Sequence, residues 1–106
     1  MALSEFRYNK KRKHFSYIFG QSKNKRKNFL LTSKSVRKRK RKNGTYKEYP
    51  NIKLYRHPNS KSNDDQYVIP IIYYDELSSF GDIESDWKFH LYDKRKIKRI
   101  QKNKWK

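Results

Sequence analysis

The sequence has no cysteine, so it can form neither a disulfide framework nor a thiolate metal site. Its three histidines, His14, His57 and His90, are widely separated and lack the spacing of metal ligands, so we expect no metal and no cofactor. The most apolar run, residues 67–74, is far shorter than the roughly 20 residues that span a bilayer. No apolar run of signal-peptide length occurs near residue 1, and a cytoplasmic protein without a membrane partner is therefore expected.

Large aliphatic side chains are also scarce. Leu, Ile, Val and Phe together make up about a fifth of the 106 residues, which is near the boundary at which a highly charged chain stays disordered. Nine Tyr and two Trp offset this shortage, because each ring can be buried while its polar edge stays hydrated. We expect one small domain with a thin core and disordered basic segments.

Acidic residues are nearly absent from the first part of the chain. Residues 1–63 contain 20 Lys and Arg against two acids, a net charge of +18. Residues 64–86 hold seven acids and no base, and residues 87–106 return to a net charge of +8, which gives +19 for the whole chain. A polyanion relieves such self-repulsion most easily, and nucleic acid is the polyanion that we expect as the partner.

Residue patterns predict short strands joined by charged segments. Aromatic, β-branched or alternating apolar residues indicate strands at 14–20, 29–32, 51–55, 67–74 and 87–91. Residues 1–13 are interpreted as a basic N-terminal arm, and residues 34–47, with six consecutive cations, as a mobile basic loop. Residues 14–106 then form a single domain that ends in a basic helix at 93–105. The fold class that follows is mainly β, a small and partly open antiparallel barrel with one C-terminal helix.

Two residues add detail to this outline. Pro70 cannot donate to a β-ladder, so it predicts a bulge or an edge within the run 67–74. Asp93 is a good N-cap and predicts the start of the helix, with Ile97, Ile100 and Trp105 near one helical face. The strands at 14–20 and 29–32 are expected to pair as a hairpin.

Four clusters of cations supply the expected contacts with phosphate. A single cluster would more simply be a solvated surface or a localisation signal, but four in so short a chain favour nucleic acid. The predicted contacts are Lys10, Lys11, Arg12, Lys13, Lys23, Lys25, Arg26, Lys27, Arg37, Lys38, Arg39, Lys40, Arg41, Lys42, Lys94, Arg95, Lys98 and Arg99.

Aromatic residues interleave with these cations. They are Tyr8, Tyr46, Tyr49, Tyr55, Tyr92 and Trp105. A basic surface with exposed rings suits single-stranded nucleic acid or unpaired RNA, although each ring could instead cover the thin core. RNA is favoured over DNA, while phosphate contacts carry no information about base sequence.

Catalysis finds weaker support in the residue pattern. Cleavage of RNA needs a base for the 2′-OH proton, an acid for the leaving oxygen and cations at the phosphate. Residues of the right types are His14, His57, Arg12, Lys13, Arg56, Thr32 and Ser33, and no spacing among them is diagnostic. The acids at 64–65 and at 82, 84 and 86 are interpreted as a charge-balancing loop rather than as a metal site.

A resemblance to a known family gives this chemistry a possible arrangement. The segment Arg12-Lys13-His14-Phe15-Ser16-Tyr17-Ile18-Phe19-Gly20, followed after a polar gap by Phe29-Leu30-Leu31-Thr32-Ser33, resembles the PemK/MazF-type toxin barrel and the related type III toxins. The resemblance implies a small SH3-like barrel that cleaves single-stranded RNA without a metal. It implies that Arg12 or Lys13 supplies the catalytic cation, that Thr32 or Ser33 supplies the catalytic hydroxyl, and that the partner is an antitoxin.

Three functions therefore stay open at this point. The first is an RNA-binding protein on a toxin-like barrel with endoribonuclease activity. The second is a non-enzymatic structural RNA binder similar to a ribosomal protein, which explains the high charge more directly. The third is an inhibitor from a phage or mobile element that binds a nuclease complex or its nucleic acid. The sequence carries no information on the oligomeric state.

Overall fold

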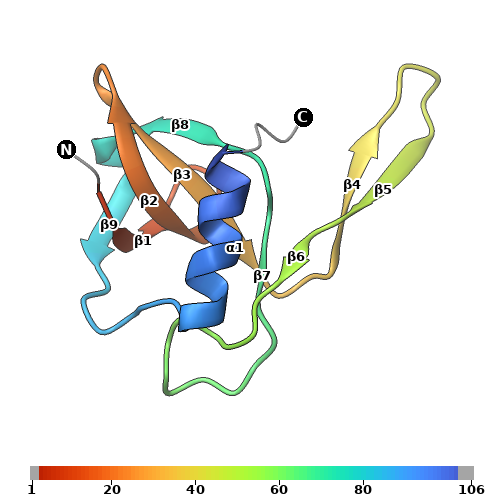
Figure 1. The fold of residues 1–106 in the computed structure, drawn as a ribbon. Coiled ribbons are helices and arrows are strands. Elements are labelled where there is room, and N and C mark those ends of the chain that lie inside the picture. Colours follow the sequence, from red (N-terminus) through yellow and green to blue (C-terminus); the bar gives the residue numbers. More distant parts are fainter. Residues whose placement is uncertain (1–2, 103–106) are drawn as a thin grey trace.

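The computed structural model describes residues 3–102 of the chain, and Figure 1 shows their arrangement. The elements in chain order are β1 (Glu5–Asn9), β2 (His14–Ser22), β3 (Lys25–Thr32), β4 (Val36–Lys40), β5 (Tyr46–Pro50), β6 (Ile52–Lys53), β7 (Tyr67–Val68), β8 (Tyr73–Glu76), a 3₁₀ turn η1 (Leu77–Ser79), β9 (Phe80–Ile83) and α1 (Leu91–Lys102). All strand pairs are antiparallel.

Most strands belong to one sheet of order β6-β7-β3-β2-β1-β9, in which β8 also pairs with β3. The sheet is curved, as Figure 1 shows. Its first and last strands do not pair, so it is not closed into a barrel. The prediction of a mainly β, partly open antiparallel fold with a single helix is confirmed. The hairpin expected from the two aromatic and aliphatic runs is β2–β3, which pairs Tyr17 with Phe29 and Ser16 with Leu30.

Helix α1 lies across one face of the sheet, as Figure 1 shows, and the core residues lie between them. Strand alternation places Phe6, Tyr17 and Phe29 on this face, since they are directly opposite one another across β1, β2 and β3. Ile97 and Ile100 of α1 pack against them at 3% and 2% exposure. A single amphipathic helix thus covers the face on which most of the scarce large side chains are concentrated.

Pro70 divides the most apolar run into two strands, where the sequence predicted a bulge or an edge within one. Ile69 still donates its backbone N–H to the oxygen of Leu30 at 2.9 Å, but Pro70 has no N–H to continue the ladder. Strand β7 therefore pairs with the end of β3, and β8 pairs separately with its beginning. Both halves lie on the same edge of β3.

The residues expected to form an N-terminal arm are part of the sheet, so this prediction was wrong. Strand β1 pairs with β2 on one side and with β9 on the other. Phe6 is 4% exposed and contacts Tyr17, Trp87 and Phe89 with ring centroids 4.8–5.9 Å apart. Burial of this one large ring outweighs the polar character of its neighbours in the sequence.

The loop expected at 34–47 is instead a β-hairpin made of β4 and β5. Alternation along β4 directs successive cations to opposite faces, and three of them pair with Tyr49, Glu48 and Tyr46. Only the Arg39–Lys47 pair places like charges directly opposite. The turn residue Gly44 has φ +87°, a value that favours glycine. The alternation of faces and the cross-strand partners thus reduce the repulsion between the cations of β4. That repulsion was the reason for predicting a loop.

Two predictions near the C-terminus also need correction. Residues 87–90 form no strand, because Phe89 packs into the core from a segment that has no ladder partner. The helix begins at Leu91, two residues before the predicted start at Asp93, and the predicted end at 105 lies outside the described residues, as does Trp105. Strand 51–55 is reduced to β6 at Ile52–Lys53, with Leu54 buried beside it.

Candidate nucleic-acid interface

A groove separates the β4–β5 hairpin from the curved sheet. Two adjoining hollows of about 620 and 730 Å³ form it, and both linings include Arg37, Lys38 and Ile69. The first hollow adds a third cation and two aromatic rings, namely Arg39, Tyr49 and Tyr73. The second adds a fourth cation, Lys34, and several polar side chains, His14, Thr32 and Ser33 among them. We call the two hollows together the hairpin groove; each is large enough for a nucleotide-sized group.

Arg37 anchors the hairpin at the base of this groove. Its Nη1 donates to the backbone oxygen of Pro50 and to Oδ1 of Asn51, each at 2.9 Å. Asn51 donates its backbone N–H to the oxygen of Ser35 at 2.8 Å and its Nδ2 to the oxygen of Lys34 at 3.0 Å. These bonds hold the two ends of the hairpin next to each other and fix the direction in which it leaves the sheet.

The groove concentrates positive charge against aromatic rings. The guanidinium carbon of Arg37 lies 5.4 Å from the ring centre of Tyr49, and Lys47 Nζ lies 5.2 Å from the same centre. Burial lowers the pKa of Arg37 most strongly and the charge of Arg39 lowers it further, whereas Tyr73 and Tyr49 act in the opposite direction. Arginine remains cationic at neutral pH, so an anion entering the groove meets a partly desolvated charge.

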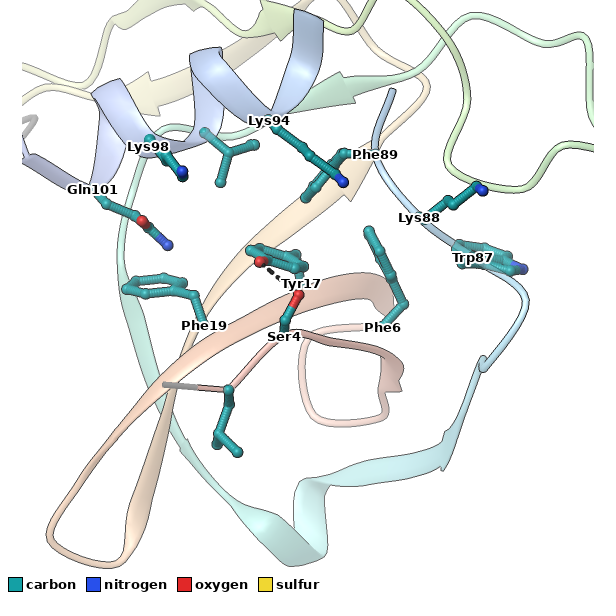
Figure 2. A pocket seen from close by; sticks show the side chains of 12 residues that line it. Ser4, Phe6, Tyr17, Phe19, Trp87, Lys88, Phe89, Lys94, Lys98 and Gln101 are labelled. Atoms are coloured by element: carbon teal, nitrogen blue, oxygen red, sulfur yellow. Dashed lines mark hydrogen bonds between the residues drawn. The ribbon is translucent and has the colours of Figure 1, made fainter. Parts of the chain in front are cut away.

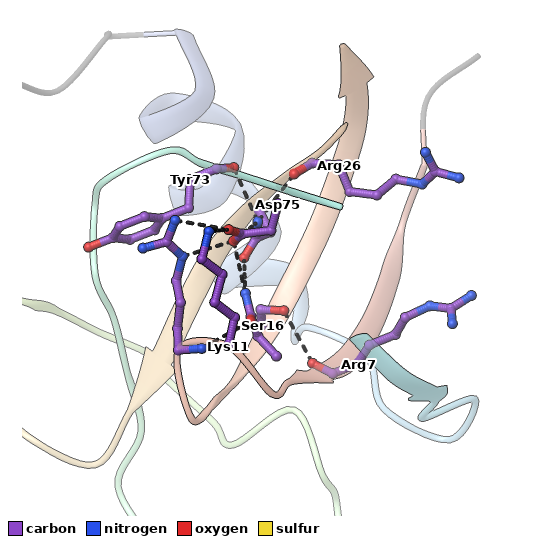
Figure 3. Close-up of polar contacts among 9 residues, drawn as sticks. Arg7, Lys11, Ser16, Arg26, Tyr73 and Asp75 are labelled. Atoms are coloured by element: carbon purple, nitrogen blue, oxygen red, sulfur yellow. Dashed lines mark hydrogen bonds and ion pairs between the residues drawn. The ribbon is translucent and has the colours of Figure 1, made fainter. Parts of the chain in front are cut away.

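A buried polar network lies beside the groove and is drawn in Figure 3. Asp75, 1% exposed, accepts from Arg12 through both carboxylate oxygens at 2.9 Å, and its Oδ2 also accepts from Asn9 at 3.0 Å and from Asn28 at 3.1 Å. The guanidinium of Arg12 stacks on the ring of Tyr73, 4.0 Å from its centre. The network therefore links the β1–β2 turn to β3 and β8.

This network sets the protonation state of Asp75. Burial alone would raise the pKa of its carboxyl, but the hydrogen bonds from Arg12, Asn28 and Asn9 and the charge of Arg12 lower it to about 2. The carboxylate is thus ionised at every physiological pH, and its charge is matched by a bidentate guanidinium. The charge-balancing interpretation was given to the acids at 64–65 and at 82, 84 and 86, and Asp75, which it did not include, is buried.

The structure separates Arg12 from the hydroxyl residues predicted to share its site. Thr32 and Ser33 line the hairpin groove together with His14 and Lys34, but Arg12 does not line that part of the groove. Its guanidinium is engaged by Asp75 instead. Thr32 is 6% exposed and its Oγ1 accepts from the backbone N–H of Lys34 at 3.2 Å, whereas Ser33 is exposed.

The side chain of His57 makes contacts that support the local fold. Its Nδ1 accepts from the backbone N–H of Asn59 at 3.0 Å, and its ring lies edge-on to Trp87 with centroids 5.5 Å apart. Burial lowers its pKa, although the charge of Asp64 and a hydrogen bond with Gln66 oppose this effect. Of the two histidines considered for catalysis, only His14 lines the hairpin groove.

The four predicted cation clusters lie on different elements. Residues 10–13 form the turn between β1 and β2, and residues 23–27 form the tip of the β2–β3 hairpin, at the opposite end of β2. Residues 37–42 form β4 and the turn after it, and the last cluster, Lys94, Arg95, Lys98 and Arg99, is exposed on α1. Only the third cluster lines the hairpin groove, so the structure does not gather all the predicted contacts into one surface.

A further hollow of about 420 Å³ lies between α1 and the sheet, as Figure 2 shows. Aromatic rings, Tyr17, Phe19 and Phe89 among them, form its apolar lining, and Lys94 and Lys98 border it from the helix. Ser4 Oγ and Tyr17 OH lie 3.0 Å apart within hydrogen-bonding distance. It belongs largely to the seam along which the helix packs on the core.

Several of the residues that define these sites escaped the sequence prediction. Asn9, Asn28 and Asp75 meet in one buried network although up to 66 residues separate them. Asp93, expected to be a helix cap, is fully buried and accepts from backbone groups of another loop. The only local indication was that Asp75 directly follows the most apolar run and can therefore share its burial.

Within residues 3–102, no three His, Cys, Asp or Glu side chains come close enough together to hold a metal ion. The one described α-helix is neither long nor apolar enough to cross a membrane. Comparison of the chain with protein-family models, with curated proteins and with solved structures gives no match.

Proposed function

We propose that the protein binds nucleic acid, RNA in preference to DNA, and that the hairpin groove holds the phosphate backbone. The observation that supports this most directly is the lining of the groove, in which Arg37, Lys38 and Arg39 share one hollow with Tyr49 and Tyr73 and Lys34 lines the adjoining hollow. Cations along a backbone with rings at intervals are the combination that single-stranded nucleic acid requires.

The charge of the whole chain supports the same proposal. Four cations in one groove repel one another in the free protein, and a phosphate between them removes that cost and releases counterions. The net charge of +19 also accelerates the approach of any polyanion at low salt. Arg37 is held by two hydrogen bonds before any ligand binds, so little side-chain entropy is lost at this position.

The test removes three exposed cations that line the groove. The variant Lys34→Gln/Lys38→Gln/Arg39→Gln leaves the anchoring Arg37 in place and should lower the affinity for a fluorescent 12-nucleotide RNA by at least about tenfold at low salt, measured by anisotropy. The matched control Lys61→Gln/Lys88→Gln/Lys102→Gln removes the same charge from exposed positions outside the groove and should lower it much less. Equal losses in the two variants would refute the assignment to the groove, and an absence of RNA binding by the wild type would refute the function.

A second candidate function is supported by one arrangement. His14, Ser33 and Lys34 line the same part of the groove. They also line a separate hollow together with Lys13. An imidazole can accept the proton of a 2′-OH, a neighbouring ammonium group can donate a proton to the leaving 5′ oxygen, and the remaining cations can stabilise the charge that develops on the phosphate. Endoribonuclease activity would then follow binding in this groove, with His14 as the base and without a direct part for Arg12.

The experiment for this activity uses end-labelled single-stranded RNA and the DNA of the same sequence. Wild-type protein should cut the RNA to fragments that carry a 2′,3′-cyclic phosphate and leave the DNA intact, because DNA has no 2′-OH. His14→Ala should slow cleavage by about 10²–10⁴-fold with unchanged RNA affinity, whereas His57→Ala, outside the groove, should not. RNA that stays intact with wild-type protein would leave a pure binder.

A further inference from the structure

An aromatic patch lies away from the hairpin groove, at the N-terminal end of α1. It consists of Tyr55, His90 and Tyr92, whose ring centroids are 4.7–5.1 Å apart. Tyr55 and Tyr92 are 61% and 53% exposed, although rings of this size gain free energy from burial. More than half of the surface of each tyrosine is left uncovered by the described residues, and the two rings come from segments nearly 40 residues apart in the sequence.

The buried Asp93 holds the two halves of this patch together. Its Oδ1 accepts from the backbone N–H of Tyr55 at 2.7 Å, and its Oδ2 accepts from the backbone N–H of Arg56 at 3.1 Å. Asp93 is fully buried in the first turn of α1, next to Tyr92 in the sequence. The carboxylate thus fixes the backbone of Tyr55 against the helix that carries Tyr92.

His90 is also fixed in orientation within the patch. Its Nδ1 accepts from the backbone N–H of Tyr92 at 3.2 Å, so in the neutral ring the proton is on Nε2, which remains able to donate. The three rings are therefore arranged before any ligand binds, which lowers the entropic cost of association.

Positive charges flank the patch. Arg56 follows Tyr55 directly and is exposed. Lys96, one turn along α1, donates from Nζ to the backbone oxygen of Lys53 at 3.0 Å and lies 3.8 Å from the carboxylate of Asp93. Exposed rings between cations suit a ligand that has both flat apolar faces and negative charges.

The geometry points to a second contact with single-stranded RNA, in which unpaired bases stack on Tyr55 and Tyr92 while Arg56 and Lys96 meet the flanking phosphates. This inference rests on the proposed function, because it assigns another contact with the same ligand. Stacking on this patch requires bases, whereas the contacts that the groove cations make with phosphate do not.

That difference provides the test. The ligands are a fluorescent 12-nucleotide RNA and a ribose-phosphate chain of the same length and charge without bases. Wild-type protein should bind the RNA at least about fivefold more tightly than the abasic chain. Tyr55→Ala/Tyr92→Ala should lose at least about fivefold in RNA affinity while its affinity for the abasic chain stays the same. The matched control Tyr74→Ala removes a ring that is 47% exposed on β8 and should change neither affinity.

A second measurement needs no variant. Irradiation of the wild-type complex with 4-thiouridine RNA should give adducts on the peptides that contain Tyr55 and Tyr92. Adducts confined to other peptides, or a double variant that binds RNA as the wild type does, would overturn the aromatic patch as an RNA contact and leave the groove proposal intact. A double variant that binds RNA as the wild type does but forms a smaller assembly would also overturn it, and would indicate that the patch mediates contact between copies of the chain. Failure of the wild type to bind either chain would instead refute the proposed function itself.

Discussion

Arg12 and Asp75 are 63 residues apart in the sequence and form a bidentate ion pair in which both N–O distances are 2.9 Å. The pair joins the β1–β2 turn, which precedes β3 in the sequence, to β8, which follows it. Its carboxylate is fully enclosed, while the guanidinium keeps 28% of its side-chain surface exposed. Arg12, one of the two residues to which the resemblance assigned a catalytic cation, is thus held in a structural ion pair.

Acid should weaken the protein through Asp75. The carboxyl has a pKa of about 2 in the folded protein against 3.8 when unfolded, so between these values only the unfolded chain binds the proton. Stability supplied by this group is therefore complete above pH 4 and is lost as the pH falls through 2, by about 2 kcal/mol in total. Urea unfolding at pH 7 and at pH 2 should show the advantage of wild type over Asp75→Asn shrinking by this amount. An advantage that is independent of pH would contradict the lowered pKa.

Loss of the Asp93 carboxylate should loosen the start of α1. Asp93→Asn leaves one acceptor for two backbone N–H groups, and the unpaired group should lower the free energy of unfolding by about 1–3 kcal/mol. The exposed Asp86→Asn changes the same charge and should stay within about 0.5 kcal/mol of wild type. Thermal and urea denaturation of both variants would measure the difference, and similar values for the two would show that the contacts of Asp93 with Tyr55 and Arg56 add little.

The salt dependence of RNA binding should report the number of groove contacts. For single-stranded nucleic acid the slope of log K against log salt is about −0.7 per phosphate neutralised. The Lys34→Gln/Lys38→Gln/Arg39→Gln variant should therefore have a slope shallower by about 2 than wild type. Anisotropy titrations over a range of about 50 to 300 mM salt would determine both slopes. A variant that binds more weakly with an unchanged slope would mean that these side chains act on the hairpin's shape rather than on phosphate.

The tip of the β2–β3 hairpin should tolerate glycine at one position and not at another. Lys23 has φ 55°, a left-handed conformation that costs a side chain about 1 kcal/mol, so Lys23→Gly should stabilise the protein by up to that amount. Lys25→Gly makes the same change of charge inside β3 and should destabilise it by about 0.5–1 kcal/mol. Urea unfolding of the pair would test this, and shifts of equal sign would exclude strain at Lys23.

Local pattern was sufficient for the strongest elements of the fold. The aromatic and aliphatic runs around Tyr17 and Phe29 predicted the β2–β3 hairpin, and Pro70 predicted a bulge or an edge in the run that the structure divides into β7 and β8. The spacing of Ile97 and Ile100 predicted the buried face of α1. In each case the deciding quantity, side-chain period or a missing N–H, belongs to a few consecutive residues.

The candidate site was less accessible from the sequence. The cations of the β4 run were predicted to contact nucleic acid, but the run was interpreted as a loop, because the residues that relieve its repulsion, Tyr49 and Glu48 among them, lie across the hairpin on β5. Arg12 was assigned to catalysis from the family resemblance, and its pairing with Asp75 could not be foreseen because Asp75 is remote in the sequence. The contribution of Phe6 to the core was missed for the same reason, since a single ring has no local period.

The sequence by itself determined a cationic, cysteine-free chain with alternating short strands and one amphipathic helix, because composition and periodicity are properties of neighbouring residues. The tertiary structure alone decided which charges are paired inside and which remain available outside. Asp75 and Asp93 are enclosed because distant donors converge on them, whereas Lys34, Lys38 and Arg39 stay exposed along a groove. Burial and partnership depend on contacts between remote segments, and those contacts exist only once the sheet has curved and the helix has packed against it.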